Sequence, residues 1–173
     1  MASTQREYSF YTGAKFNRHT ILQDGRGQIA GRIGEAEFAK QLCFHAPQFC
    51  WSGPEKTPYD FIVRLKPDVS VTIDVKTKKR NVPVQNHYSA HVTLSQRNYD
   101  VDVYVFANET KGCVSLMGWC SKNWFWDHAV IVSEGDREQA GNSFEERDEA
   151  GKLLYSELRP MKEMWEKLDS YSG

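Results

Sequence analysis

The stretch Tyr59-Asp60-Phe61-Ile62-Val63, followed after a short gap by Val71-Thr72-Ile73-Asp74-Val75-Lys76, decides the fold. Both pieces alternate polar and apolar residues, which is the pattern of strands with one buried face. Between them lies Pro67-Asp68, a typical turn dipeptide, because proline presets φ and aspartate can bond its own backbone. The proline is midway between the two aspartates, so a hairpin folded about it places Asp60 opposite Asp74.

Two facing aspartates pose an electrostatic problem. Directly opposed residues of an antiparallel pair have Cβ atoms ~5 Å apart, and like charges there are unfavourable. A divalent cation between the carboxylates would remove this repulsion. The alternation places Lys76 on the face of Asp74, so a plain salt bridge, worth ~0–1 kcal/mol when exposed, is the simpler alternative.

A helix is predicted over residues 28–44. One stripe of it, at helical spacing, is small or apolar apart from a single carboxylate and consists of Gly31, Glu35, Phe38, Ala39 and Leu42. Glu35 is therefore a candidate functional residue, with a snorkelling surface glutamate as the alternative. Glycine in a helix costs ~1 kcal/mol relative to alanine, so we expect a neighbouring strand to come close at Gly31 and Gly34.

Further elements follow the hairpin. Strands are predicted at residues 101–107 and 114–120, and the first is nearly apolar, as central strands are. Residues 124–132 are ambiguous and are expected to begin as a short helix and end as a strand. Residues 152–158 are predicted to return as a strand, and residues 161–168 to form a last helix with one apolar face.

Composition places the chain among ordinary globular proteins. Its 173 residues fit one domain, with 26% charged and 40% apolar residues. Residues 1–27 are predicted to be an irregular N-terminal arm, and residues 134–151 a mobile acidic loop. The formal net charge of −1 provides no global attraction for nucleic acid, so a polyanion would need a local basic patch or a metal.

No apolar window reaches the ~18 residues of a membrane-spanning helix, and the N-terminus lacks the apolar region of a signal peptide. We therefore expect a cytoplasmic protein without a membrane partner. The cysteines fall in two pairs whose spacing is wider than the about two to four residues typical of zinc ligands, so reduced thiols are expected. These residues are Cys43, Cys50, Cys113 and Cys120.

Three pieces of the sequence together resemble the PD-(D/E)XK nuclease superfamily, over roughly residues 28–107. They are Gly34-Glu35 on the helix, Tyr59-Asp60 for the PD element, and Asp74-Val75-Lys76 for the (D/E)XK element. Tyrosine replaces the proline of the PD element. The resemblance implies a restriction-endonuclease-like α/β fold with a three-layer core. In it, a central mixed sheet of about five strands, in an α-β-β-β-α-β order, is flanked by helices.

The resemblance further implies a DNA endonuclease that hydrolyses phosphodiester bonds with Mg²⁺ or Mn²⁺. The metal-binding positions that it implies are Glu35, Asp60, Asp74 and Val75. Lys76 then serves the attacking water, and Gln96 is the candidate for a catalytic glutamine found downstream in some relatives. The residue types suit this chemistry, because Mg²⁺ prefers oxygen ligands and a lysine can orient or deprotonate a metal-bound water.

The basic run Lys78-Lys79-Arg80 directly follows the acids. Such a run is usually a solvated strand end, but here it is a candidate for holding DNA phosphates beside the metal. Many nucleases of this kind cut two strands as dimers, so a homodimer is a further expectation. The alternative function is a catalytically inactive module of the nuclease fold that binds DNA or a protein partner. A metal-dependent phosphoesterase of small molecules is a third class.

Overall fold

The computed structural model describes residues 26–46, 48–52, 57–85, 87–133, 135–136 and 148–171, with the side chains of residues 26–28 excepted. The predicted arm therefore lies outside the described residues except for its last two positions, which begin a helix. Most of the predicted acidic loop also lies outside them. Within the described part of the chain, no helix is long and apolar enough to cross a membrane.

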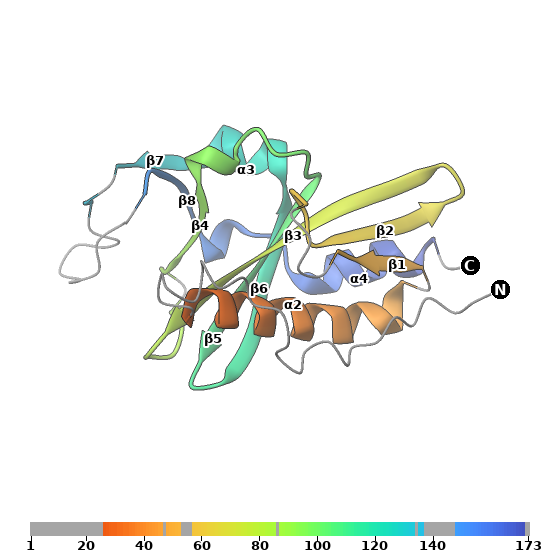
Figure 1. The fold of residues 1–173 in the computed structure, drawn as a ribbon, viewed down its shortest axis with the longest axis horizontal. Helices are drawn as coiled ribbons and strands as arrows, with labels where there is room; N and C mark the ends of the chain where they lie inside the picture. The colour runs from red at the N-terminus through yellow and green to blue at the C-terminus, as the bar shows by residue number, and fades with distance from the viewer. Residues whose placement is uncertain are drawn as a thin grey trace.

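Five strands form one mixed sheet (Figure 1). In spatial order they are β1 (Phe49–Trp51), β2 (Phe61–Lys66), β3 (Val69–Arg80), β5 (Val103–Thr110) and β6 (Cys113–Ser121). Strands β3 and β5 are parallel and the other neighbours are antiparallel. The predicted α/β class with a five-stranded mixed sheet is confirmed, and β5 is internal, as its apolar sequence indicated.

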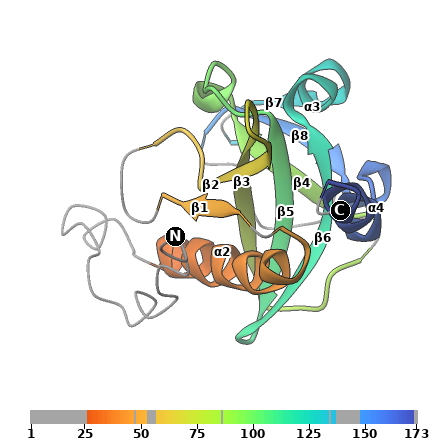
Figure 2. The ribbon, with the colours of Figure 1, turned by 90° about the vertical axis from the view of Figure 1, so that its right-hand side faces the viewer.

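Two helices cover one face of this sheet. Helix α2 (Arg26–His45) runs across it, and helix α4 (Met161–Asp169) packs beside α2 (Figure 2). The predicted stripe of α2 is buried, because Phe38, Ala39 and Leu42 are inaccessible to solvent. The stripe enters a core that also contains Met164 from α4 and the sheet's own apolar side chains.

A second, smaller sheet covers the other face. It has the order β4 (Ser89–Thr93), β8 (Ala150–Leu154) and β7 (Val130–Val132), and helix α3 (Lys122–His128) packs beside it. The ambiguous segment 124–132 is thus helix followed by strand, as expected. Strand β4 is an element that the sequence analysis missed.

The connection between the parallel strands β3 and β5 departs from the expected α-β-β-β-α-β order. It passes through β4 and the 3₁₀ helix η2 (Leu94–Gln96) instead of an α-helix. Parallel neighbours need a long crossover that packs on the sheet. Here β4 provides that cover, because its apolar residues Ala90 and Val92 enter the second core with Phe106 of β5.

The hairpin of β2 and β3 has the predicted register from Phe61 to Arg64, and an irregularity next to the turn then places Lys66 opposite Val69. Phe61 lies opposite Ile73 and Val63 opposite Val71, and the turn is at Pro67-Asp68. The ladder stops one residue short of the predicted Asp60–Asp74 pair. There the N–H of Asp60 donates to the carbonyl of Ile73 at 2.9 Å, so Asp60 sits at the open end of the hairpin and its side chain lies beside β3.

Candidate functional site

Helix α2 approaches strand β3 most closely at Gly34. A Cβ added to Gly34 would lie 1.8 Å from Oγ1 of Thr77, which leaves no room for any side chain. The close approach predicted for Gly34 is confirmed. The same prediction for Gly31 is wrong, because nothing lies within 4 Å of a Cβ there. The absent side chain of Gly34 thus lets the next residue, Glu35, reach the sheet.

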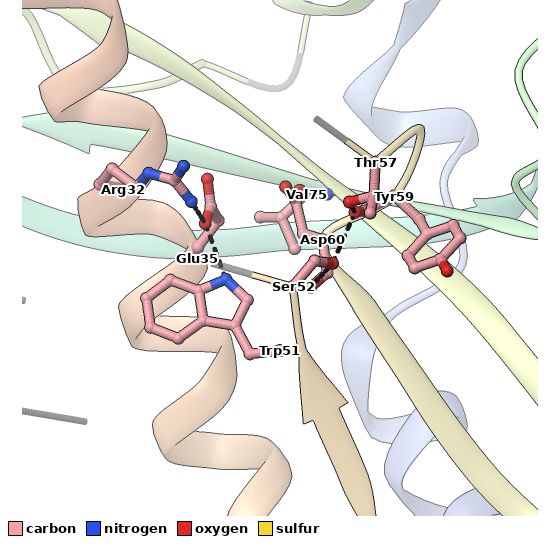
Figure 3. A network of polar contacts seen from close by, with 8 residues as sticks. All are labelled: Arg32, Glu35, Trp51, Ser52, Thr57, Tyr59, Asp60 and Val75. Carbon is pink, nitrogen blue, oxygen red and sulfur yellow. Dashed lines mark hydrogen bonds and ion pairs between the residues drawn. The ribbon is translucent and has the colours of Figure 1, made fainter. Parts of the chain in front are cut away.

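Glu35 is buried and held by two donors (Figure 3). Its Oε2 lies 2.5 Å from Nη1 of Arg32 and accepts the indole N–H of Trp51 at 2.9 Å. Burial raises the pKa of Glu35, the Arg32 guanidinium and both hydrogen bonds oppose that rise, and the charge of Asp74 adds to it. The carboxylate is therefore oriented by its neighbours and also senses a second acid of the site.

Asp60 belongs to a segment whose main chain is clamped. The hydroxyl of Ser52 donates to the carbonyls of Tyr59 and Asp60, at 2.8 Å each, and Thr57 also donates to Tyr59 (Figure 3). The Asp60 carboxylate turns toward β3, where its Oδ2 accepts the N–H of Val75 at 2.8 Å. Since the Val75 side chain is buried in the core, only its main chain faces the site.

The pKa of Asp60 lies well above its usual range. Desolvation is the largest cause, the negative charges of Glu35 and Asp74 come next, and the Val75 hydrogen bond and Lys76 oppose the rise. Glu35 and Asp60 thus each have a pKa raised by another acid of the set. The charge of Asp74 thus acts on both Glu35 and Asp60.

Asp74 and Lys76 form an ion pair on the sheet face opposite α2. Asp74 is 5% exposed, and its Oδ2 lies 2.6 Å from Nζ of Lys76. Their partners on β5 are Tyr104 and Phe106, which belong to the second core. The simple salt bridge is therefore present, and it holds Lys76 beside Asp74.

Gln96 lies at the same place. It ends η2 and lines, together with Lys76 and Lys78, a cavity of about 280 Å³ between β3 and the small sheet. Its lining also includes the buried Phe106 and the acidic Asp148. The structure thus brings together Gln96 and Lys76, which are distant in the sequence.

The basic run does not form one patch. Lys78 lines the cavity, whereas Lys79 points to the other face and lies 3.5 Å from the buried carboxylate of Glu109. Arg80 lies over the ring of Tyr88, with Cζ 4.4 Å from its centroid. Strand alternation divides the run between the two faces, so a single phosphate-binding surface made of all three side chains is excluded.

Trp51 and Ser52 are site residues that the sequence analysis missed. Both come from the end of β1, which reaches the site only because β1 pairs with β2. No local pattern signals this pairing. The ion pair of Arg32 and Glu35 was foreseeable, since residues three apart on a helix are neighbours.

The donor set consists of carboxylate oxygens, which are the ligand type that Mg²⁺ prefers. Among the described residues, no group of three or more His, Cys, Asp or Glu side chains is arranged to hold a metal ion as it stands. Glu35 and Asp74 instead pair with Arg32 and Lys76. With all groups ionised, three carboxylates against two cations leave one uncompensated negative charge. Oxygen donors with excess negative charge suit Mg²⁺, provided that these ion pairs exchange.

Comparison with known proteins adds no information on function, so the inference about chemistry rests on the geometry of the site. No protein-family model matches the chain, and no curated protein sequence matches it. The observations that bear on function are the buried carboxylates of Glu35 and Asp60 near Asp74, the lysine paired with Asp74, and the cavity that this lysine shares with Gln96.

Proposed function

We propose that this protein is a DNA endonuclease that hydrolyses phosphodiester bonds with Mg²⁺ or Mn²⁺. The observation that carries the proposal is the cluster of Glu35, Asp60 and Asp74, in which burial and the charge of Asp74 raise the pKa of both Glu35 and Asp60. Retaining mutually repelling carboxylates costs stability, and perturbed acids of this kind concentrate at functional sites. The ion pair between Lys76 and Asp74 supplies the second catalytic element.

Each residue has a role in this proposal. Asp60 and Asp74 would hold the ion with Glu35. The N–H of Val75 donates to Asp60, and the main-chain carbonyl of the same residue would be a further ligand. A bound ion polarises the phosphoryl oxygen and lowers the pKa of its water. Lys76, at its Nζ, would orient that water or take its proton and would offset charge developing on the phosphate.

The proposed substrate is DNA, and the proposed location of the protein is the cytoplasm. Lys78 and Gln96 line the cavity beside Lys76, so they are the candidates for contacting DNA next to the reacting phosphate. A homodimer remains the expectation for cutting both strands of a duplex. Sedimentation of the protein with and without a short duplex measures this directly.

The test is cleavage of plasmid and branched DNA in Mg²⁺, in Mn²⁺ and in EDTA. We expect Asp74→Asn and Lys76→Gln each to lose at least about 100-fold in rate, because a ligand and a general acid–base group are removed. Asp68→Asn is the matched control, since Asp68 is exposed in the β2–β3 turn and should cleave normally. Equal cleavage by wild type and both site variants would falsify the proposal.

The alternative, an inactive nuclease-fold module that binds DNA or a protein, is favoured by one observation. The Glu35 and Asp74 carboxylates are each already paired with a cation of the protein. A site that needs no ion predicts a melting temperature indifferent to Mn²⁺. The nuclease instead predicts a rise that Asp74→Asn abolishes, because an ion that binds only the folded state stabilises it.

A further inference from the structure

Arg32 stands between the buried Glu35 and the solvent. Its Nη1 lies 2.5 Å from Glu35 Oε2, and the side chains are 32% and 9% exposed, respectively. The same Oε2 accepts the indole N–H of Trp51 (Figure 3). Both donors therefore converge on one oxygen of Glu35, and a cation that took this oxygen as a ligand would have to displace the guanidinium.

A divalent ion makes the site more positive. Glu35, Asp60 and Asp74 lie against the two cations Arg32 and Lys76, and the ion adds two positive charges to this set. A phosphodiester group carries one negative charge. A DNA phosphate should therefore bind more favourably after the ion has entered than before.

The guanidinium of Arg32 is suited to leave Glu35. A divalent ion on the same oxygen repels it, because like charges at contact distance are strongly unfavourable. The planar fork of arginine matches phosphate oxygens in pairs. The ring of Trp51, whose centroid lies 6.0 Å from Arg32 Cζ, offers a surface over which the guanidinium can turn without losing all of its contacts.

We propose that Arg32 is a DNA-binding residue, whose guanidinium exchanges Glu35 for a DNA phosphate when Glu35 takes up the divalent ion. The inference rests on the proposed nuclease function and adds to it a named phosphate-binding side chain. The exchange makes the ion and DNA bind cooperatively. The ion displaces Arg32 from Glu35 and frees it for a phosphate, and a phosphate draws Arg32 away and frees Glu35 for the ion. By linkage, the ion raises the affinity for DNA by the factor by which DNA raises the affinity for the ion.

Arg32→Gln tests the exchange, because its two effects have opposite signs. Without DNA, Mn²⁺ should bind about tenfold more tightly by calorimetry, since the competing charge-assisted hydrogen bond is gone. In Ca²⁺, with the DNA checked to be intact, DNA should bind about tenfold more weakly, and the slope of log affinity against log salt should fall by about one. Lys40→Gln, which removes an exposed cation from the same helix, should do neither.

Glu35→Gln tests the same exchange in EDTA. Removal of the carboxylate charge should free Arg32, so DNA should bind several-fold more tightly than to wild type, and the double variant with Arg32→Gln should lose the gain. Glu37→Gln is the matched control, because it removes one acid from α2 and leaves the contact of Arg32 with Glu35 intact.

The outcomes separate this inference from the proposed function. Weaker Mn²⁺ binding by Arg32→Gln would mean that Arg32 only positions Glu35, and an unchanged salt slope would mean that it never contacts phosphate; either overturns the exchange. A wild type that binds Mn²⁺ and cleaves DNA keeps the nuclease proposal in both cases. A wild type that neither binds Mn²⁺ nor cleaves overturns both. If Arg32→Gln melts early, the EDTA comparison of Glu35→Gln with the double variant decides.

Discussion

At the scale of single residues, the site consists of acids that are unfavourable in isolation and are held by specific donors. Glu35 has Arg32 and Trp51, and Asp60 has the N–H of Val75. These contacts orient the carboxylates but do not offset the cost of burying them beside other acids, since the pKa values of Glu35 and Asp60 stay raised. The residues therefore carry a cost in stability that a purely structural role does not explain.

Asp60→Asn should stabilise the protein in EDTA at neutral pH. The pKa of Asp60 is raised well above its value in the unfolded chain. At a pH above the unfolded-state pKa, ionisation of Asp60 therefore favours the unfolded chain. At a pH below it, Asp60 is protonated in both states and has no such effect. The amide oxygen of asparagine can still accept the Val75 N–H. We expect the Asn variant to melt at a higher temperature than wild type at pH 8.

The measurement is thermal unfolding in EDTA from pH 3.5 to 8. The advantage of the Asn variant should shrink toward zero as the pH falls below ~4, the unfolded-state value for aspartate. A lower melting temperature for Asp60→Asn at pH 8 would show that the carboxylate stabilises the fold, contrary to the repulsion described above.

At the scale of elements, the site depends on how closely helix α2 lies against strand β3. Gly34 sets this distance, because a Cβ there would meet Thr77. Strand β1 matters equally, since it delivers Trp51 to Glu35 and Ser52 to the main chain of Asp60. The hairpin alone brings Asp60 near Asp74, and it needs the helix and β1 to complete the cluster.

Gly34→Ala and Gly31→Ala should have opposite effects on stability. The methyl group at Gly34 forces α2 away from Thr77, which should cost about 1–3 kcal/mol and weaken Mn²⁺ binding by displacing Glu35. At Gly31 nothing lies within 4 Å, so alanine should stabilise the helix by up to about 1 kcal/mol. Urea unfolding of both variants is the measurement, and equal effects would refute the role of Gly34.

At the scale of the whole molecule, the main sheet has a core on each face. The face of α2 and α4 was predictable from apolar periodicity, whereas the second core depends on the small sheet of β4, β8 and β7. This second core encloses the apolar side chains of β5 that alternate with those facing α2. It also buries Cys120, unlike the three exposed cysteines of the described residues.

The thiols should therefore react in two classes. Burial raises the pKa of Cys120 to about 12, so its reactive thiolate is scarce at pH 8. Cys43, Cys50 and Cys113 are exposed and should react quickly with a thiol reagent such as DTNB. The fourth thiol should react only when urea unfolds the second core. Four equally fast thiols would mean that the small sheet does not close over β5.

Turn chemistry and the periodicity of apolar residues were enough to predict several parts of the structure. The turn at Pro67-Asp68, the β2–β3 register and the buried stripe of α2 follow from turn chemistry and from periods of two and 3.6 residues. Those same rules placed Asp74 and Lys76 on one face. They also identified Glu35 as an acid in an apolar row, so the main members of the site could be named before the fold was known.

The remaining features could not be predicted, because they depend on contacts between residues distant in the chain. The indole of Trp51 on Glu35, the cavity that joins Gln96 to Lys76, and the small sheet have no local signal. The N–H of Asp60 bonds to the carbonyl of Ile73, and not to its predicted partner Asp74, because the regular ladder ends at Phe61. Periodicity predicts which residues share a face of a helix or strand. Packing between elements determines which residue each buried charge contacts.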